Sequence, residues 1–285
     1  MGVVYAAWDV KLEREVAIKV LGENFRQHHA AWGFFLREGR ILSSLNHPYI
    51  TTIYDVGEEN DEPYIAMEYI DGCPLSRLVM SPGLAWPLVA HAARDIASAL
   101  GYAHEHGLIH RDIKSSNIMV TREGDLKVLD FGLAKRVHPS TLQRLSESDS
   151  FTQEHGIVAG TIHYLAPDVL RGERPSVWSD IWALGVLIYE MSTGAFPFSG
   201  RTIFEVTTAI MTAEPAPPPR EIPDWIQRVV AKCLERNVGR RYRSVRDLTL
   251  DIPTHGIPDR TEMAMEVDRL HPALAHVAAQ ASGAA

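Results

Sequence analysis

The pattern of apolar residues changes its period near Asp71-Gly72, and this change constrains the fold more than any other feature. Before it, short runs rich in β-branched and aromatic residues alternate with charged turns, as in antiparallel strands. After it, apolar residues recur at helical spacing, as in the stripe of Leu88, Ala92, Ile96, Leu100 and Ala103. The sequence therefore predicts an α+β fold with a small antiparallel β-sheet lobe and a larger, mainly helical lobe.

The small lobe is expected to hold four strands, at residues 3–7, 15–20, 50–56 and 64–69. The last two are separated by an acidic turn, Glu58 to Glu62. One helix, marked by Phe34, Phe35, Ile41 and Leu42, is predicted before His47-Pro48. The large lobe is expected to hold helices around 88–106, 176–194, 203–213 and 225–236, with Pro87 in the first turn of the first and Gly107 at its end.

These patterns predict three segments: a small lobe at 1–70, a large lobe at 71–251 and a partly disordered tail at 252–285. The net charge is −8 and no long Lys/Arg run occurs, so we expect no nucleic-acid partner. The most apolar run, Ile181 to Met191, is about half the length that a bilayer requires, so no membrane segment is predicted in this chain. Cys73 and Cys233 lie far apart, which indicates a reducing, cytoplasmic location.

The run Val16-Ala17-Ile18-Lys19 places a lysine at the end of a predicted strand. Its ammonium group suits a nucleotide phosphate. Glu38 falls on the apolar side of the predicted helix, where a carboxylate is costly unless it is paired. A Lys19–Glu38 ion pair is one interpretation, and two unrelated surface charges fit these residues equally well.

The segment His110 to Asn117 carries the groups that phosphoryl transfer to a hydroxyl requires. Asp112 can orient a hydroxyl nucleophile, and Lys114 can neutralise the transferring phosphate. The amide oxygen of Asn117 is a hard ligand that suits magnesium, as is the carboxylate of Asp130. A short hairpin at 118–129 would bring these residues together.

With these motifs in sequence order, the chain resembles the protein kinase catalytic domain, and within it the bacterial eukaryotic-like (Hanks-type) serine/threonine kinases. The resemblance covers residues 1–251. Its further motifs are Arg37 to Leu42, Met67 to Ile70, Asp130 to Gly132, Gly160 to Asp168, Ser179 to Gly185, and Arg241.

The resemblance implies an ATP-dependent protein serine/threonine kinase that uses Mg²⁺, with Mn²⁺ as an alternative. It implies that Lys19 binds the phosphates and pairs with Glu38, that Asp112 is the catalytic base beside Lys114, and that Asn117 and Asp130 are the metal ligands. The remaining ATP-binding positions that it implies are Gly2, Val4, Ala17, Met67, Glu68, Ile70 and Met119. Structural or regulatory roles are implied for Arg111, Phe131, Thr161, Asp168, Asp180 and Arg241.

The segment between Asp130 and Asp168 is long and rich in hydroxyl residues. Long loops of this kind are often functional. We expect autophosphorylation at Thr152, with Ser150 and Ser148 as further candidates, and pairing of the phosphate with Arg111. A solvated, serine-rich loop is the alternative. Autophosphorylation would involve a transient homodimer, and the expected partners are proteins that bear Ser or Thr.

The sequence departs from the family pattern in three places. Gly2 matches only the third glycine of the glycine-rich loop, so the chain is interpreted as truncated within that loop, with a start further upstream. The resemblance then implies that the small lobe at 1–70 is incomplete at its N-terminus and that its first strand is missing. This departure supports an alternative function, a catalytically impaired nucleotide-binding scaffold. Asp168 replaces a glutamate, so its pair with Arg241 is expected to be strained or bridged by water. Ser115 replaces a common proline and is expected to loosen the catalytic loop slightly.

Overall fold

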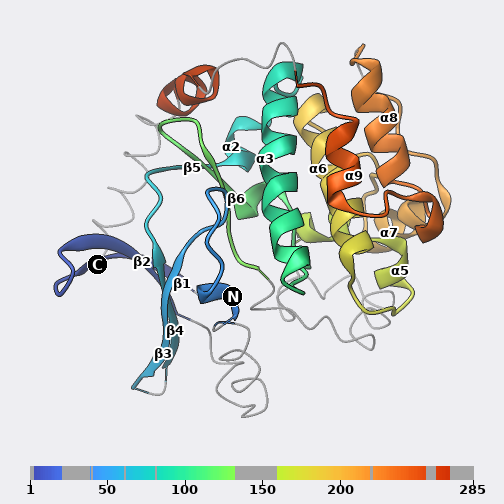
Figure 1. The fold of residues 1–285 in the computed structure, drawn as a ribbon. Coiled ribbons are helices and arrows are strands. Elements are labelled where there is room, and N and C mark those ends of the chain that lie inside the picture. Colours follow the sequence, from blue (N-terminus) through green and yellow to red (C-terminus); the bar gives the residue numbers. More distant parts are fainter. Residues whose placement is uncertain are drawn as a thin grey trace.

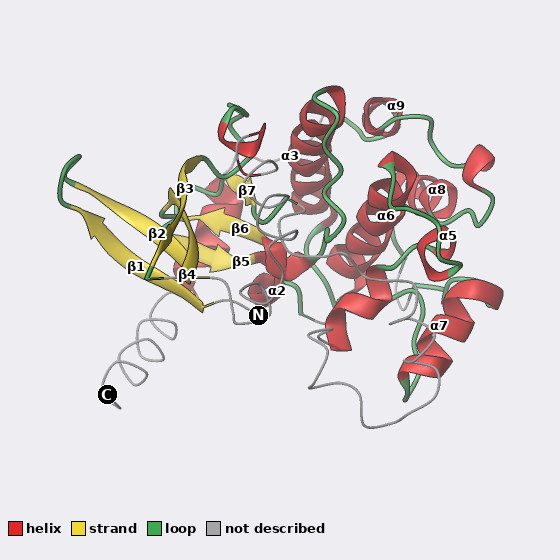
Figure 2. Cartoon of the chain, turned by 90° about the horizontal axis from the view of Figure 1, so that it is seen from below, coloured by secondary structure: helices red, strands yellow, loops and turns green. Residues whose placement is uncertain are grey.

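The strands gather on one side of the molecule and the helices on the other, as Figures 1 and 2 show for this computed structural model. The structure describes residues 3–20, 39, 41–60, 62–80, 82–131, 159–218, 221–254 and 261–269. Most of the helix predicted before His47 therefore lies outside the described residues, although residues 41–43 are helical.

The small lobe contains a four-stranded antiparallel sheet in the order β1-β2-β4-β3. Its strands are β1 (Val3–Asp9), β2 (Arg14–Val20), β3 (Ile53–Glu59) and β4 (Glu62–Glu68). The four predicted strands are thus confirmed. The register places Ala17 of β2 opposite Met67 of β4, and Lys19 opposite Ile65.

The acidic segment Glu58 to Glu62 is not the turn that the sequence predicted. Glu58 and Glu59 belong to β3, Glu62 belongs to β4, and the ladder pairs Glu59 with Glu62. All three side chains are exposed, so their charges stay in water while the backbone hydrogen bonds extend the hairpin. The turn is shorter, and Asn60 adopts a left-handed backbone with φ of 50°.

A second sheet lies where the two lobes meet, in the order β5-β6-β7. Its strands are β5 (Gly72–Pro74), β6 (Ile118–Thr121) and β7 (Leu126–Val128). The predicted hairpin is confirmed as β6–β7, whereas β5 was not predicted because three residues are too few to show an alternating pattern.

The large lobe is built around α3 and α6, which pack against each other beside the second sheet (Figure 1). Its helices are α2 (Leu75–Leu78), α3 (Trp86–Glu105), α5 (Pro167–Leu170), α6 (Val177–Thr193), α7 (Ile203–Thr212), α8 (Asp224–Cys233) and α9 (Val245–Leu250). Two short 3₁₀ helices, η2 (Ser115–Asn117) and η3 (Ala159–Tyr164), carry site residues.

Helix ends follow the capping residues in the sequence. Pro87 lies in the first turn of α3, and Gly107 just after it adopts a φ of 74°. A capping box formed by Ser176 and Ser179 begins α6, and Gly194 in the left-handed conformation ends it. Helix α8 ends at Cys233, three residues before the predicted end, because Leu234 already caps it.

The sequence pattern indicated that the core ends near Asp251, but the structure shows that it continues beyond this residue. Ile252 is buried, and so are Met263 and Val267 of the helical residues 261–269. Their spacing of four places both side chains on one helix face. The division of the chain at 70–71 and 251–252 remains a prediction. Among the described residues, no helix is long and apolar enough to cross a membrane.

Candidate active site

Hydrogen bonds connect Asp112 with Lys114 and Asn117, and Lys114 with Thr161. The Nζ atom of Lys114 lies 2.9 Å from Asp112 Oδ2 and 3.0 Å from the Thr161 hydroxyl. The amide of Asn117 donates to Asp112 Oδ2 at 3.0 Å and to its backbone oxygen at 2.8 Å. These bonds fix the carboxylate and bring the catalytic loop against Thr161 of η3.

Asp180 of α6 binds the start of the catalytic loop, residues 110–117, through the loop backbone. Its buried carboxylate accepts bonds from the backbone N–H groups of His110 at 2.8 Å and Arg111 at 2.9 Å, and lies 2.8 Å from His104 Nε2. A buried carboxylate is stable only with such partners. Arg111 has a φ of 69°, a costly conformation that persists where surrounding contacts enforce it.

His110 and Phe131 connect the catalytic loop to the segment that carries Asp130. Their ring centroids lie 4.5 Å apart, and His110 Nε2 lies 2.8 Å from the Leu129 backbone oxygen. Burial lowers the pKa of His110 below its usual value. The Leu129 N–H in turn donates to the backbone oxygen of Asn117 at 2.9 Å, so the two candidate metal ligands belong to connected segments.

Lys19 reaches Asp130, with its Nζ 2.6 Å from Asp130 Oδ2. The contact brings a predicted phosphate-binding group from the small lobe to a predicted metal ligand from the large lobe. Asp130 has a φ of 55°, a left-handed backbone that is uncommon for a non-glycine residue. Glu38 and Gly2 lie outside the described residues, and the Lys19–Glu38 pair stays a prediction.

Asn117 and Asp130 fit a divalent cation by their chemistry. Because the Asn117 nitrogen is bonded to Asp112, its amide oxygen is the atom that can ligate a metal. An amide oxygen and a carboxylate suit Mg²⁺, which usually takes its other ligands from substrate phosphates and water. The described residues hold no group of three or more His, Cys, Asp or Glu side chains suited to a metal.

The predicted adenine-contacting residues come from both sheets. Ala17 and Met67 are buried opposite each other in β2 and β4, and Val4 in β1 is more than half exposed. Met119 lies in β6, opposite Lys127 of β7. Glu68 ends β4, and Ile70 follows in the connection to the large lobe.

Asp168 and Arg241 form a direct ion pair, which contradicts the expected water bridge, while the expected strain stays a prediction. Arg241 donates to Asp168 Oδ1 at 2.7 Å, and both side chains are buried. The guanidinium group also donates to the backbone oxygens of Glu235 at 2.7 Å and Trp178 at 3.0 Å. The shorter aspartate therefore still reaches its partner.

Sequence reasoning missed Glu190, whose carboxylate accepts bonds from the Ser115 hydroxyl at 3.0 Å and from the Tyr164 hydroxyl. The signal was present: Glu190 is the one charged residue in the apolar run Ile181 to Met191. A lone carboxylate in such a run predicts buried hydrogen-bond donors around it. The candidate phosphorylation sites Thr152, Ser150 and Ser148 lie outside the described residues.

The fold and this arrangement of groups define a protein kinase. The family model described as the protein kinase domain matches residues 1–249, and the chain belongs to that family. Membership implies use of ATP and a divalent metal ion. The crystal structure titled Rad53 1-466 in complex with AMP-PNP matches with a TM-score of 0.70 at 25% identity, over 87% of this chain and 60% of that one.

Among curated proteins, the relatives include bacterial serine/threonine-protein kinases. PrkC of Bacillus subtilis is 35% identical over 264 residues, 91% of this chain and 39% of that protein. PknB of Mycolicibacterium smegmatis is 35% identical over 260 residues, 88% of this chain and 40% of that protein. The probable PknB of Lactococcus lactis is 37% identical over 270 residues, 91% of this chain and 41% of that protein. The chain thus spans about two fifths of the length of these relatives.

Proposed function

We propose that this chain transfers the γ-phosphate of ATP to Ser or Thr hydroxyls of protein substrates. The observation that carries the proposal is the set of contacts among Asp112, Lys114, Asn117 and Thr161. A carboxylate held by two donors is suited to orient a hydroxyl nucleophile, and the adjacent ammonium can stabilise charge on the transferring group.

The proposed roles follow from these contacts. Asp112 orients the substrate hydroxyl and accepts its proton, while Lys114 contacts the phosphate as it transfers. Lys19 holds the phosphates of ATP from the small lobe. Asn117 and Asp130 would hold Mg²⁺, which supplies positive charge against the phosphates when it is bound. Phosphoryl transfer depends largely on such positioning and electrostatic stabilisation.

The alternative function is a catalytically impaired nucleotide-binding scaffold. The contacts of Asp112 and the names of the relatives favour an enzyme.

Replacing Asp112 with Asn tests the proposal, because the variant keeps the shape of the side chain but removes the base. We expect transfer from γ-labelled ATP to a Ser/Thr protein substrate to fall by a factor of about 10² to 10⁴, the usual contribution of a positioned base. Nucleotide binding, measured by calorimetry with Mg-ATP, should persist in both proteins. Transfer at background level by both proteins would support the scaffold, whereas equal transfer above background would exclude Asp112 as the base.

Regulation by autophosphorylation is proposed for the segment that carries Thr152, Ser150 and Ser148. A phosphate there would pair with Arg111, the residue next to the catalytic base. A transient homodimer would present one chain's segment to its partner's active site. Mass spectrometry after incubation with Mg-ATP should find phosphate, with Thr152 as the main site, and Thr152→Ala should lower activity. An unmodified segment would contradict this proposal.

A cytoplasmic location is proposed for the catalytic chain. Cys73 and Cys233 are buried free thiols, the usual state of cysteine in a reducing compartment. Fractionation of cells that express the tagged chain would test the location.

A further inference from the structure

Ser115, Tyr164 and Glu190 form a closed set of hydrogen bonds beneath the catalytic loop. The Ser115 N–H donates to the Tyr164 hydroxyl oxygen at 3.3 Å, and the Ser115 hydroxyl donates to Glu190 Oε1 at 3.0 Å. The Tyr164 hydroxyl donates to the other carboxylate oxygen. Ser115 is 5% exposed and Tyr164 is 6% exposed, so these bonds are largely shielded from water.

The hydroxyl groups of Ser115 and Tyr164 stabilise the buried carboxylate of Glu190. Burial raises the pKa of Glu190, and the bonds from Tyr164 and Ser115 oppose that rise. Burial and the nearby carboxylate also raise the pKa of Tyr164, so its hydroxyl stays a donor. Because a buried carboxylate is costly without donors, loss of the Ser115 hydroxyl would leave Glu190 with one donor fewer.

This set of bonds holds the end of the catalytic loop on α6. Asp180 of the same helix holds the start of the loop, through the N–H groups of His110 and Arg111. Ten residues of helix, roughly 15 Å, separate Asp180 from Glu190. Asp112 and Lys114 lie in the sequence between the two attachment points, so α6 fixes the loop on both sides of the catalytic groups.

The bonds between Ser115 and Tyr164 lie next to the Lys114–Thr161 contact, which joins the catalytic loop to η3. Lys114 precedes Ser115, and its Nζ lies 3.0 Å from the hydroxyl of Thr161, three residues before Tyr164. Ser115 and Tyr164 thus form a second link between these two segments. Proline at position 115 has neither the N–H nor the hydroxyl that this link uses. These contacts contradict the loosening expected from the serine.

We propose that Ser115 is a positioning residue for phosphoryl transfer, which acts through Glu190 and Tyr164 to hold Lys114 and Asp112 in place. The inference rests on the proposed kinase function, because positioning has a measurable effect only where there is transfer. Its consequence is a loss in turnover rather than in nucleotide binding, since the adenine-contacting residues belong to other segments.

Ser115→Ala tests the inference by removing the hydroxyl alone. We expect kcat for a Ser/Thr peptide to fall about tenfold, which corresponds to roughly 1.4 kcal/mol in the barrier. The KM for ATP should change by less than about twofold, because uniform binding is retained. The matched control is Ser192→Ala, which removes a different buried hydroxyl, one in α6 that donates to the Ile188 backbone oxygen at 2.7 Å. Its kcat should equal that of the wild type.

A double mutant tests whether Ser115 acts through Glu190. If it does, Ser115→Ala combined with Glu190→Gln should have the same kcat as Glu190→Gln alone, because residues in one network are not additive. Multiplicative losses in the double mutant would overturn the proposed route. So would an unchanged kcat in Ser115→Ala, or an equal loss in Ser192→Ala.

Hydrogen exchange supplies a measurement that does not require turnover. The backbone amides of residues 113–117 should exchange faster in Ser115→Ala than in the wild type, and at the wild-type rate in Ser192→Ala. Absence of transfer by the wild-type chain would contradict the proposed function, whereas unchanged exchange in Ser115→Ala would contradict the anchoring role itself. The two failures are therefore distinguishable.

Discussion

His110 is hydrogen-bonded in a way that only its neutral form satisfies. Its Nε2 faces the Leu129 backbone oxygen at 2.8 Å and must carry the proton, while its Nδ1 accepts the Asp112 N–H at 3.2 Å. Protonation of Nδ1 would set two donors against each other in a buried site. Burial accordingly lowers the pKa of His110, although the carboxylates of Asp180, Asp112 and Asp130 oppose this shift.

This lowered pKa predicts a loss of stability in mild acid. Below the unfolded-state pKa of about 6.5, the unfolded chain binds a proton at His110 that the folded chain does not, so stability falls as the pH falls. We expect the free energy of unfolding to decrease from pH 7 to pH 5. His110→Phe should be less stable at pH 7 but should show a shallower decrease, by up to about 1.4 kcal/mol per pH unit. Urea unfolding at several pH values measures both slopes, and parallel slopes would contradict the prediction.

At the scale of helices, Gly185 sets how closely α6 and α8 pack. A Cβ atom at this position would lie 2.3 Å from the Cβ of Cys233 and 3.3 Å from a methyl carbon of Leu234. Cys233 is fully buried, so the side chain has little room to move away. Gly185→Ala should therefore force the helices apart and lower the free energy of unfolding by about 1 to 3 kcal/mol.

Gly101 of α3 provides the matched control, because a Cβ there meets no atom within 4 Å. Alanine has the higher helix propensity, so Gly101→Ala should raise the free energy of unfolding by about 0.5 to 1 kcal/mol. Equilibrium unfolding in urea would measure the two variants together. An increase in the free energy of unfolding in both variants would show that helix propensity, not the contact between α6 and α8, decides the outcome at Gly185.

The accuracy of the predicted elements depended on local signals. The ends of α3 and α6 were predicted well because Pro87, Gly107, Ser176 and Gly194 mark them through local backbone geometry. The extension of β3 and β4 into the acidic segment depends on pairing across the hairpin, which composition does not reveal. The catalytic groups were predicted from their spacing, whereas the role of Glu190 depends on Ser115 and Tyr164, which are distant in sequence.

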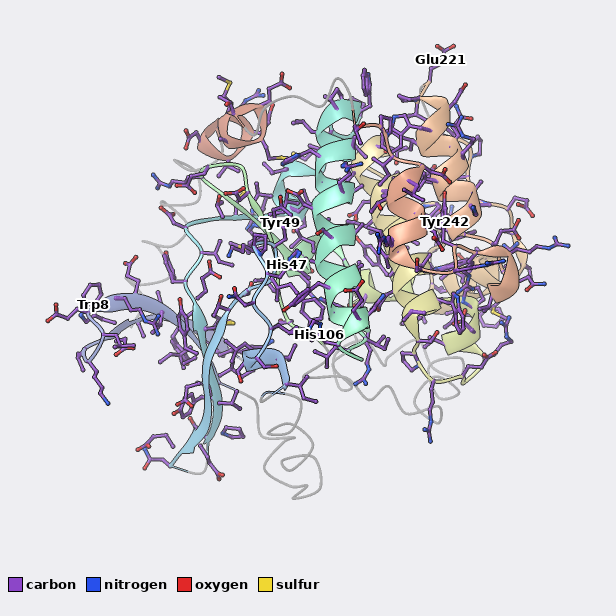
Figure 3. All side chains as sticks on the ribbon, in the orientation of Figure 1. Trp8, His47, Tyr49, His106, Glu221 and Tyr242 are labelled. Atoms are coloured by element: carbon purple, nitrogen blue, oxygen red, sulfur yellow. The ribbon has the colours of Figure 1, made fainter. Side chains whose placement is uncertain are left out.

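At the scale of the whole molecule, the change in the period of apolar residues predicts the division into two lobes. It does not predict which residues connect the lobes. The connection is made by β7: the Val128 N–H donates to the Tyr49 oxygen at 2.8 Å, and the Thr51 N–H donates to the Val128 oxygen at 3.1 Å. Figure 3 shows Tyr49 and His47 beside α3, on the side toward the strands of the small lobe. These contacts join segments more than seventy residues apart, which one sequence does not show.

One ion pair crosses the same junction and leads to a prediction about the coupling of the lobes. Lys127 Nζ of β7 lies 2.8 Å and 3.0 Å from the two carboxylate oxygens of Glu68, and Oε2 of Glu68 also accepts the Thr52 N–H at 3.2 Å. The side chains are 17% and 25% exposed, so water screens the pair only in part. Lys127→Met and Glu68→Gln should each lower the free energy of unfolding by about 1 to 2 kcal/mol, as expected for charge-assisted hydrogen bonds.

The double variant should lose less stability than the two single variants together, because each single change already breaks the pair. The matched control is Asp71→Asn, which removes a more exposed ion pair with Arg122, 3.0 Å long, near the same junction. Its effect should be too small to measure, since water screens exposed pairs. Urea unfolding of these four variants measures the losses in the free energy of unfolding. Additive losses from the Glu68 and Lys127 changes would mean that their contact does not couple the two lobes.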